Sequence, residues 1–407
     1  MSKAIPDVRF KGLNGEWEQR KLESIYGKIR NAFVGTATPY YVEDGHFYLE
    51  SNNVKDGQIN RNTEVFINDE FYEKQKDKWL HTGDLVMVQS GHVGHTAVIP
   101  KELDNTAAHA LIMFSDYREK TEPYFLNYQF QTHNSKKKLN NIKTGNTIEH
   151  ILASEMKKFL VDIPKYEEQQ KIGTFFKQLD DLIALKQRLI EQQQQYKKAM
   201  LQKMFPQKGE RVPKVRFDGF SGDWEIRKFK DFISKAGKKN SSGKDYISYS
   251  VSNKLGLVRQ DEQFEGSRLD NLDKKAYKLV NPNEFAYNPA RINVGSIAFN
   301  NLGITVIVSS LYVVLKMSDK INNEYILQFI KTQNFTNEVK RNTEGSVREY
   351  LFYENFKNIK FPYTSNYKEQ QKIGDFFKQL DDTIALHQKK LEDYQQLKKA
   401  LLQRMFV

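Results

Sequence analysis

The sequence predicts an α+β fold: two tandem mixed α/β domains joined by two long helices that form an antiparallel coiled coil with pseudo-twofold symmetry. Residues 168–185 and 369–386 are identical at 16 of 18 positions. Residues 8–22 and 215–229 are identical at nine of 15 positions. Each half of the chain therefore opens with one repeated phrase and closes with another, which indicates a tandem repeat. The stretches between the phrases diverge, but both contain short runs of β-branched and aromatic residues.

The repeats divide the 407 residues into four segments. We expect a first domain at residues 1–162, a helix at 163–207, a second domain at 208–360 and a second helix at 361–407. Each domain is expected to hold a sheet with a buried face, because runs such as LVMVQ, ALIMF and SIAFN are typical of buried strands. Short helices such as EYILQFIKTQNF, at 324–335, are expected beside the strands.

The closing segments predict two long helices, each with one apolar seam. Apolar residues recur at spacings of three and four for more than four heptads, starting at Ile172 and again at Ile373. Pro164 and Pro362 stand just before the helices, where proline is tolerated. A single helix with one apolar stripe is not stable as a lone rod, so two such seams most simply bury each other. The residues expected to pair the helices are Ile172, Phe176, Leu179, Ile183, Ile190, Met200, Ile373, Phe377, Leu380, Ile384, Leu391 and Leu401.

Polar letters of the repeated helix phrase lie off this seam and recur unchanged in the second copy. We expect them to face outward and to form a surface on which a partner docks once per copy. A purely structural coiled coil is the alternative, although it does not explain why these letters are repeated. The residues are Gln169, Gln170, Lys171, Lys177, Gln178, Asp180 and Asp181.

Composition narrows the class of protein. The chain has no cysteine, which removes disulfides, thiolate metal sites and cysteine nucleophiles and fits a reducing cytoplasm. The N-terminal residues MSKAIPDVRF lack an apolar core, and no run of 18 apolar residues follows, so we expect a cytoplasmic protein that does not span a membrane. The net charge is +12, of which +8 lies in residues 208–360, and this favours a polyanionic partner.

Motifs for catalysis are not found, and we predict no catalytic residue and no metal site. Asp180 and Asp181 are adjacent on a helix and point about 100° apart, so they cannot easily share a proton or a metal. GKKNSSGKD, at 237–245, has five residues between its glycines where a phosphate loop has four. His92 and His95 have no carboxylate or thiol cluster beside them. A nuclease or methyltransferase of unusual sequence remains an open alternative.

Two polar loops at matching places are the candidates for binding DNA. Asn and Gln can pair with adenine edges and Arg with guanine, whereas lysines and exposed backbone amides suit phosphates. Because the loops differ in their polar letters, each would recognise a different sequence. The base-contact candidates are Gln89, Ser90, His92 and His95 in the first loop, and Asn288, Arg291, Asn293 and Ser296 in the second. The phosphate-contact candidates lie in lysine-rich segments and in the turns that follow them. They are Lys136, Lys137, Lys138, Lys143, Asn146, Thr147, Ser346 and Arg348.

The whole chain resembles the specificity subunits of Type I restriction-modification systems. The resemblance rests on the tandem architecture, on EEQQKIGTFFKQLDDLIALKQR with its copy KEQQKIGDFFKQLDDTIALHQK, and on the W-E-x-R-K openings. It implies two target recognition domains that each read one half of an asymmetric, split DNA site, and helices that fix the gap between the half-sites. It also implies two modification subunits with S-adenosylmethionine-dependent adenine N6-methylation, and restriction subunits that use ATP and Mg²⁺. No cofactor is then expected in this chain, and the family supplies no residue-level site.

Overall fold

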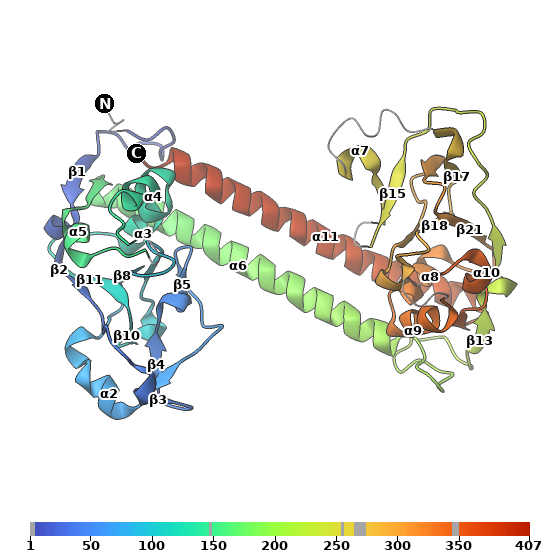
Figure 1. Cartoon of the computed structure of the whole chain (residues 1–407), viewed down its shortest axis with the longest axis horizontal. Coiled ribbons are helices and arrows are strands. Elements are labelled where there is room, and N and C mark those ends of the chain that lie inside the picture. The colour runs from blue at the N-terminus through green and yellow to red at the C-terminus, as the bar shows by residue number, and fades with distance from the viewer. Residues whose placement is uncertain (1–4, 146–148, 254–255, 264–273, 344–349) are drawn as a thin grey trace. The chain divides into compact units, whose positions relative to one another are not determined.

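The computed structural model describes residues 5–145, 149–253, 256–263, 274–343 and 350–407. The chain divides into two compact units. Unit 1 comprises residues 1–187 together with 389–407, and unit 2 comprises residues 188–388. The division passes through both long helices, α6 (Tyr166–Lys203) and α11 (Tyr367–Arg404), which are drawn in green and red in Figure 1. Each unit therefore contains one mixed domain, part of α6 and part of α11.

Unit 1 is built around a four-stranded antiparallel sheet in the order β2-β11-β8-β9. A second four-stranded sheet has the order β10-β4-β7-β3, and the pairs β1-β12 and β5-β6 complete the strands. The strands are β1 (Glu18–Lys21), β2 (Tyr26–Asn31), β3 (Tyr41–Val42), β4 (His46–Leu49), β5 (Val54–Lys55), β6 (Gln58–Ile59), β7 (Phe66–Ile67), β8 (Leu85–Val88), β9 (Thr96–Val98), β10 (Ala107–Ala108), β11 (Leu111–Tyr117) and β12 (Leu160–Ile163). The shorter helices are α1 (Leu22–Ile25), α2 (Asp69–Lys74), α3 (Pro123–Gln131), α4 (His133–Asn140) and α5 (Ala153–Lys158).

Unit 2 repeats this plan with a four-stranded antiparallel sheet in the order β14-β21-β18-β19. The pairs β13-β22, β15-β16 and β17-β20 surround it. The strands are β13 (Glu225–Lys228), β14 (Ile233–Lys235), β15 (Tyr249–Ser252), β16 (Gly256–Arg259), β17 (Lys278–Val280), β18 (Glu284–Tyr287), β19 (Ile297–Phe299), β20 (Val306–Val308), β21 (Val313–Met317) and β22 (Lys360–Tyr363). The shorter helices are α7 (Gln260–Gln263), α8 (Asn323–Ile330), α9 (Gln333–Asn342) and α10 (Tyr353–Phe356).

Strand β8, one of the two inner strands of the main sheet of unit 1, shows why its sequence is a continuous apolar run. Leu85 and Met87 of β8 face the core that contains α3 and the long helices, whereas Val86 and Val88 face a second core. A strand buried on both faces needs apolar residues at every position rather than at alternate ones. The predicted strands and the mixed α+β class are confirmed. The predicted helical run at 324–335 is two helices, because the Thr332 hydroxyl caps the start of α9.

The long helices pair antiparallel within each unit, as predicted. In unit 1, Phe176 of α6 contacts Phe406, just past α11, with ring centroids 5.9 Å apart, and Asp180 Oδ1 lies 2.6 Å from Lys398 Nζ. As the residue number rises along α6, from Phe176 to Asp180, the number of the contacted residue falls, from Phe406 to Lys398. The two helices therefore run antiparallel. In unit 2, Lys197 forms an ion pair with Asp381. Asp381 is the repeat counterpart of Asp180, 201 residues later, and Lys197 is the counterpart of Lys398, 201 residues earlier. The same ion pair therefore occurs in both units, with the roles of α6 and α11 exchanged.

The predicted helix-pairing residues lie on the inner side of the helices. Ile172, Phe176, Leu179, Ile190, Ile373, Phe377 and Ile384 are buried. Ile183, Met200, Leu380, Leu391 and Leu401 are half-buried. The ends of the helices do more than pair with each other, since they also enter the domain cores. Phe406 packs against Trp17 and Phe125 in unit 1, and Phe205 packs against Trp224 and Tyr325 in unit 2.

The two repeated phrases of each half are joined by a buried ion pair. Arg9 of the opening phrase forms two hydrogen bonds to the Glu168 carboxylate, through Nε at 2.6 Å and Nη2 at 2.5 Å. Arg216 binds Glu369 in the same way, at 2.6 and 3.0 Å. The glutamate side chains are 2% and 0% exposed. A planar guanidinium matches a carboxylate in this two-point geometry, which explains why these letters recur.

Two letters predicted to face outward are in fact buried, and the prediction is wrong for Gln169 and Asp180. Gln169 is 3% exposed and bridges the Pro164 carbonyl and the Glu122 amide. Asp180 is 4% exposed and accepts a hydrogen bond of 2.9 Å from the Tyr128 hydroxyl. The reason is that α3 packs on the flank of α6, so the helix has a second buried face beside the seam.

Gly173 shows how closely α3 approaches α6. A Cβ atom placed on Gly173 would lie 3.0 Å from the Phe125 backbone nitrogen and 2.8 Å from a Glu122 side-chain atom. The same crossing recurs in unit 2, where a Cβ on Gly374 would lie 2.9 Å from the Tyr325 backbone nitrogen. A side chain at either position would push the two helices apart. The glycine of the repeated phrase is therefore a packing residue.

Candidate nucleic-acid interface

The first candidate loop follows β8 and is held by backbone hydrogen bonds at both ends. The Val88 amide donates to the His95 carbonyl at 2.8 Å, and the Ile151 amide donates to the Gln89 carbonyl at 3.0 Å. Gly91 and Gly94 adopt φ values of +80° and +90°, a region that favours glycine. The loop is therefore a compact turn with a defined backbone conformation.

The side chains of this loop differ in their exposure. His92 is exposed, whereas Gln89, Ser90 and His95 are half-buried. The Gln89 side-chain oxygen is buried and has no hydrogen-bond partner among the described residues. His92 and His95 lie near each other, with ring centroids 6.4 Å apart. The loop therefore exposes the His92 imidazole, whereas the unsatisfied oxygen of Gln89 lies below the surface.

His95 connects the loop to the turn between β5 and β6. Its Nδ1 accepts a hydrogen bond of 3.2 Å from the Asp56 backbone amide. Burial lowers the pKa of His95; the Asp56 carboxylate opposes this, but Lys136 and other nearby positive groups act in the same direction as burial. A neutral imidazole that accepts at Nδ1 carries its proton on Nε2. His95 can therefore offer a donor to an acceptor such as N7 or O6 of guanine.

The second candidate loop follows β18 and has the same backbone frame. The Asn288 amide donates to the Ser296 carbonyl at 3.2 Å, and the Leu351 amide donates to the Pro289 carbonyl at 3.0 Å. Arg291 and Asn293 are exposed. The Asn288 side-chain oxygen accepts a hydrogen bond of 3.0 Å from the Ala290 amide, so half of its amide is used inside the turn.

Ser296 does not lie at the surface, and its assignment as a base contact is corrected. It is 4% exposed, and its hydroxyl donates to the Val251 carbonyl at 3.0 Å. Ser296 occupies the position of His95, because each carbonyl accepts the backbone hydrogen bond that closes its loop, from Val88 in unit 1 and from Asn288 in unit 2. Both side chains tie their loop to a neighbouring turn or strand. The sequence alignment of the loops could have shown this equivalence, but not the burial.

The lysines predicted to contact phosphates fall into two groups. Lys136 and Lys137 of α4 are exposed. Lys138 binds the Asp162 carboxylate at 3.2 Å, and Lys143 binds the Glu149 carboxylate at 2.9 Å. These two ammonium groups are partly neutralised inside the unit, so Lys136 and Lys137 are the stronger candidates. Asn146, Thr147, Ser346 and Arg348 lie outside the described residues.

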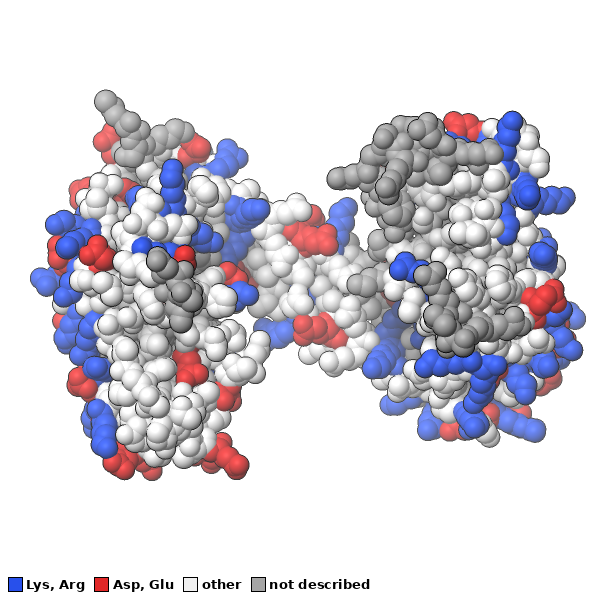
Figure 2. Space-filling view, viewed as in Figure 1, with Lys and Arg blue, Asp and Glu red and all other residues white. Residues whose placement is uncertain are grey.

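Two basic residues that were not among the sequence-based candidates lie in the same part of unit 1. Lys55 precedes the β5–β6 turn that touches His95, and Lys399 lies in the last turns of α11. The signal for Lys399 was available, because Lys398-Lys399 repeats Lys197-Lys198 at the same distance of 201 residues. In unit 2, Figure 2 shows Lys and Arg side chains gathered over the lower part of the unit in this view, around α9.

Within the described ranges, no three His, Asp or Glu side chains gather closely enough to hold a metal ion. Across the same ranges, none of the helices combines the length and the apolar character needed to span a lipid bilayer.

Comparisons with known proteins agree with this organisation. A family model described as Type I restriction modification DNA specificity domain matches residues 14–194 and again 221–395. The chain is 20% identical to the Type I restriction enzyme MjaVIII specificity subunit of Methanocaldococcus jannaschii, over 97% of this chain and 94% of that protein. It is 22% identical to the putative type I restriction enzyme MjaX specificity subunit of the same organism, over 95% and 92%.

A solved structure shares the fold. The Type I restriction-modification system S subunit from M. genitalium matches with a TM-score of 0.66 and 14% sequence identity, over 99% of both chains. The two matches of the family model cover most of the chain and coincide with its two sequence repeats. The chain therefore belongs to the Type I restriction-modification DNA specificity family, as a specificity subunit with two recognition domains.

Proposed function

We propose that this non-catalytic subunit reads a bipartite, asymmetric DNA site, with one half-site for each recognition domain. The observation that carries the proposal is the equivalence of the two loops after β8 and β18. They share their backbone hydrogen bonds but present different side chains, with His92 in one and Arg291 and Asn293 in the other. A common frame with different donors and acceptors is suited to reading two different base sequences.

The paired helices are proposed to set the gap between the half-sites. α6 and α11 contain 38 residues each. At about 1.5 Å per residue, each helix is about 57 Å long, which is sufficient for domains that contact half-sites about 34 Å apart. Support comes from the ion pairs between α6 and α11 inside each unit, because they fix the register of one helix against the other.

The modification subunits are proposed to dock on the outer letters of the helix phrase, one subunit per copy. Four of these letters are exposed in both copies, which is the support for a shared external role. They are Gln170, Lys171, Gln178 and Asp181, with their counterparts Gln371, Lys372, Gln379 and Asp382. Adenine N6-methylation with S-adenosylmethionine, and restriction with ATP and Mg²⁺, are proposed to take place in the partner subunits, in the cytoplasm.

The test is to map methylated adenines in DNA exposed to the complex of this chain with its modification partner. We expect a split motif with two specific halves and a fixed, unspecific gap. The variant Arg291→Ala should relax the base choice in one half only, and His92→Ala should affect only the other half. A single continuous motif would refute the proposal, and so would equal relaxation of both halves by either variant.

A further inference from the structure

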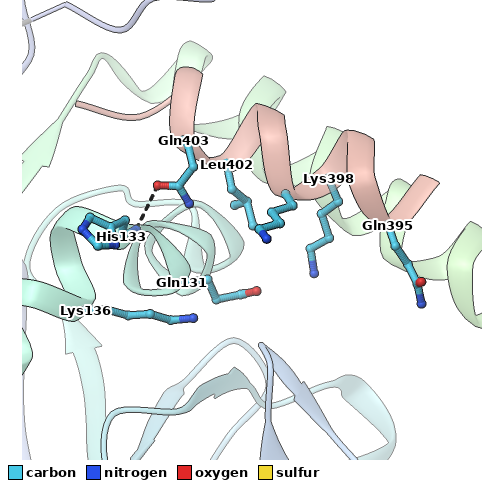
Figure 3. A pocket seen from close by; sticks show the side chains of 8 residues that line it. Gln131, His133, Lys136, Gln395, Lys398, Leu402 and Gln403 are labelled. Atoms are coloured by element: carbon cyan, nitrogen blue, oxygen red, sulfur yellow. Dashed lines mark hydrogen bonds between the residues drawn. The ribbon is translucent and has the colours of Figure 1, made fainter. Parts of the chain in front are cut away.

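A basic pocket lies in unit 1 where α3 and α4 meet the last turns of α11. Its volume is about 360 Å³. Figure 3 shows the side chains of Gln131 and Lys136 reaching toward the space beneath α11, with Lys398 and Gln395 above it. The lining residues are Gln131, His133, Lys136, Gln395, Lys398, Lys399, Leu402 and Gln403.

The lining carries three ammonium groups and no carboxylate. Lys398 is already neutralised, because its Nζ lies 2.6 Å from Asp180 Oδ1 beside the Tyr128 ring. Lys136 and Lys399 are exposed, and neither pairs with a carboxylate among the described residues. The pocket therefore has an excess of positive charge together with amide donors, which is the chemistry that binds a phosphate oxygen.

The wall of the pocket is continuous with the first reading loop. Gln131 contacts the β5–β6 turn so closely that a Cβ on Gly57 would lie 2.1 Å from its Nε2. The preceding residue of that turn, Asp56, donates its backbone hydrogen bond to His95. On the opposite wall, Gln403 accepts a hydrogen bond of 3.1 Å from the His133 amide, which holds α11 against the start of α4.

We propose that this pocket binds a phosphate of the DNA backbone beside the half-site read by unit 1, through Lys136 and Lys399. The inference rests on the proposed function and deepens it. It also gives the end of α11 a role in DNA binding, although that helix follows the second recognition domain in the chain. A phosphate is favoured over an acidic side chain of a protein partner because the pocket adjoins the reading loop.

Unit 2 has a different arrangement at the equivalent place. Lys331 stands where Gln131 stands, since each precedes the threonine that caps the next helix. Its ammonium binds the Asp381 carboxylate at 2.8 Å. Thr336 replaces Lys136 by the same count from the capping threonine. Lys198 is the counterpart of Lys399, so what unit 2 lacks is the lysine at the Lys136 position. The two-lysine contact is therefore specific to unit 1, and only one side of the DNA site should depend on it.

The experiment measures DNA affinity of the full complex over a range of salt concentrations, for the wild type, Lys136→Ala, Lys399→Ala and the double variant. Lys157→Ala is the matched control, because Lys157 of α5 is an exposed lysine of the same unit that neither lines the pocket nor belongs to the proposed DNA-contacting residues. Each lost phosphate contact should reduce the steepness of the salt dependence by about one. Between about 50 and 200 mM salt, this makes the defect about 3.5-fold larger at the low-salt end for each contact.

A second measurement locates the contact. DNA in which single phosphates are replaced by neutral methylphosphonates should show one position, next to the unit 1 half-site, that weakens the wild type but not the double variant. Lys399→Arg should retain affinity because it keeps the charge. Melting temperatures of all variants should match the wild type, since both lysines are exposed.

The outcomes are distinct. If the wild type binds DNA without salt dependence, the proposed function fails. If the wild type is salt-dependent but the pocket variants behave like Lys157→Ala, the pocket inference alone is overturned. It is also overturned if the variants keep DNA affinity and instead lose assembly with the modification subunit, because the pocket then holds an acidic group of that partner.

Discussion

Replacing Arg9 with methionine should destabilise unit 1 chiefly through the loss of the cation that faces the Glu168 carboxylate. The substitution also removes hydrogen bonds from Arg9 to the exposed Asn14 and Gly15 carbonyls, and Arg216 makes the equivalent bonds to Ser221 and Gly222. Glu168 is 2% exposed, and both of its oxygens accept hydrogen bonds from Arg9. Methionine keeps much of the apolar stem of the arginine and removes the charge. The variant therefore tests the ion pair with little change in packing volume.

The loss in unfolding free energy follows from the cost of leaving the Glu168 carboxylate buried without its cation. Removing one partner of a buried ion pair costs about 3–5 kcal/mol. An upper limit for the charge itself comes from protonation. A glutamate of ordinary pKa, about 4.3, can be neutralised at pH 7 for about 3.7 kcal/mol. At pH 5 the same neutralisation costs about 1 kcal/mol. The cost of Arg9→Met should therefore be about 3 kcal/mol at pH 7 and should shrink as the pH falls toward 5.

The assay is urea unfolding at pH 7 and pH 5, with hydrogen exchange to assign the loss to unit 1. Arg216→Met is the matched variant in unit 2, where the Thr364 hydroxyl also donates to Glu369 at 2.8 Å. That remaining hydrogen bond should make Arg216→Met the milder of the two. The double variant Arg9→Met with Glu168→Met should recover most of the loss, because it removes the buried charge.

Two results would refute this reasoning. One is a cost below about 1 kcal/mol at pH 7, the range expected for exposed ion pairs. The other is a cost of the same size at pH 5 and pH 7, which would show that lost packing rather than a stranded charge is responsible.

Three further predictions follow from other contacts. Gly173→Ala should destabilise by about 1–3 kcal/mol in thermal unfolding, because the new Cβ meets a backbone nitrogen of α3 at 3.0 Å, whereas the same change at an exposed helix site would stabilise. Ser296→Ala should cost about 1–2 kcal/mol through the lost hydrogen bond to Val251 while leaving the methylated motif unchanged; an altered motif would restore Ser296 as a base contact. Burial raises the pKa of Asp381, but positive neighbours including Lys331 outweigh it and lower the pKa below its ordinary value. The resulting stability is present above about pH 3.9 and is lost as the pH falls through the folded-state pKa, so melting temperatures of the wild type and Asp381→Asn should converge only below about pH 4.

The periodic parts of the fold could be predicted from the sequence because spacing alone determines them. The three-four spacing from Ile172 predicts the long helix, and the repeat of that spacing from Ile373 predicts its partner. The run at 85–89 predicts a buried strand, and the structure shows why it is apolar throughout, since both of its faces are covered. These signals survive in a single sequence because each is a local pattern.

The roles of individual polar letters could not be predicted in this way. Gln169 and Asp180 lie off the seam, and they are buried by the contact between α3 and α6, to which Lys398 of α11 adds an ion pair at Asp180. Ser296 lies in a polar loop of the kind that is usually exposed, yet its hydroxyl donates a hydrogen bond to the Val251 carbonyl of a neighbouring strand. Such contacts join segments that are 45 or more residues apart, and no local pattern encodes them.

Unit 2 is one continuous stretch, residues 188–388, whereas unit 1 needs residues 389–407 to place Phe406 against Trp17. A ribosome makes residues 1–187 first, but the core of that unit stays incomplete until the last turns of α11 have been synthesised. Unit 2 can finish folding before then. Domains usually fold in the order of their synthesis, and in this chain the first to be made is the last to be completed.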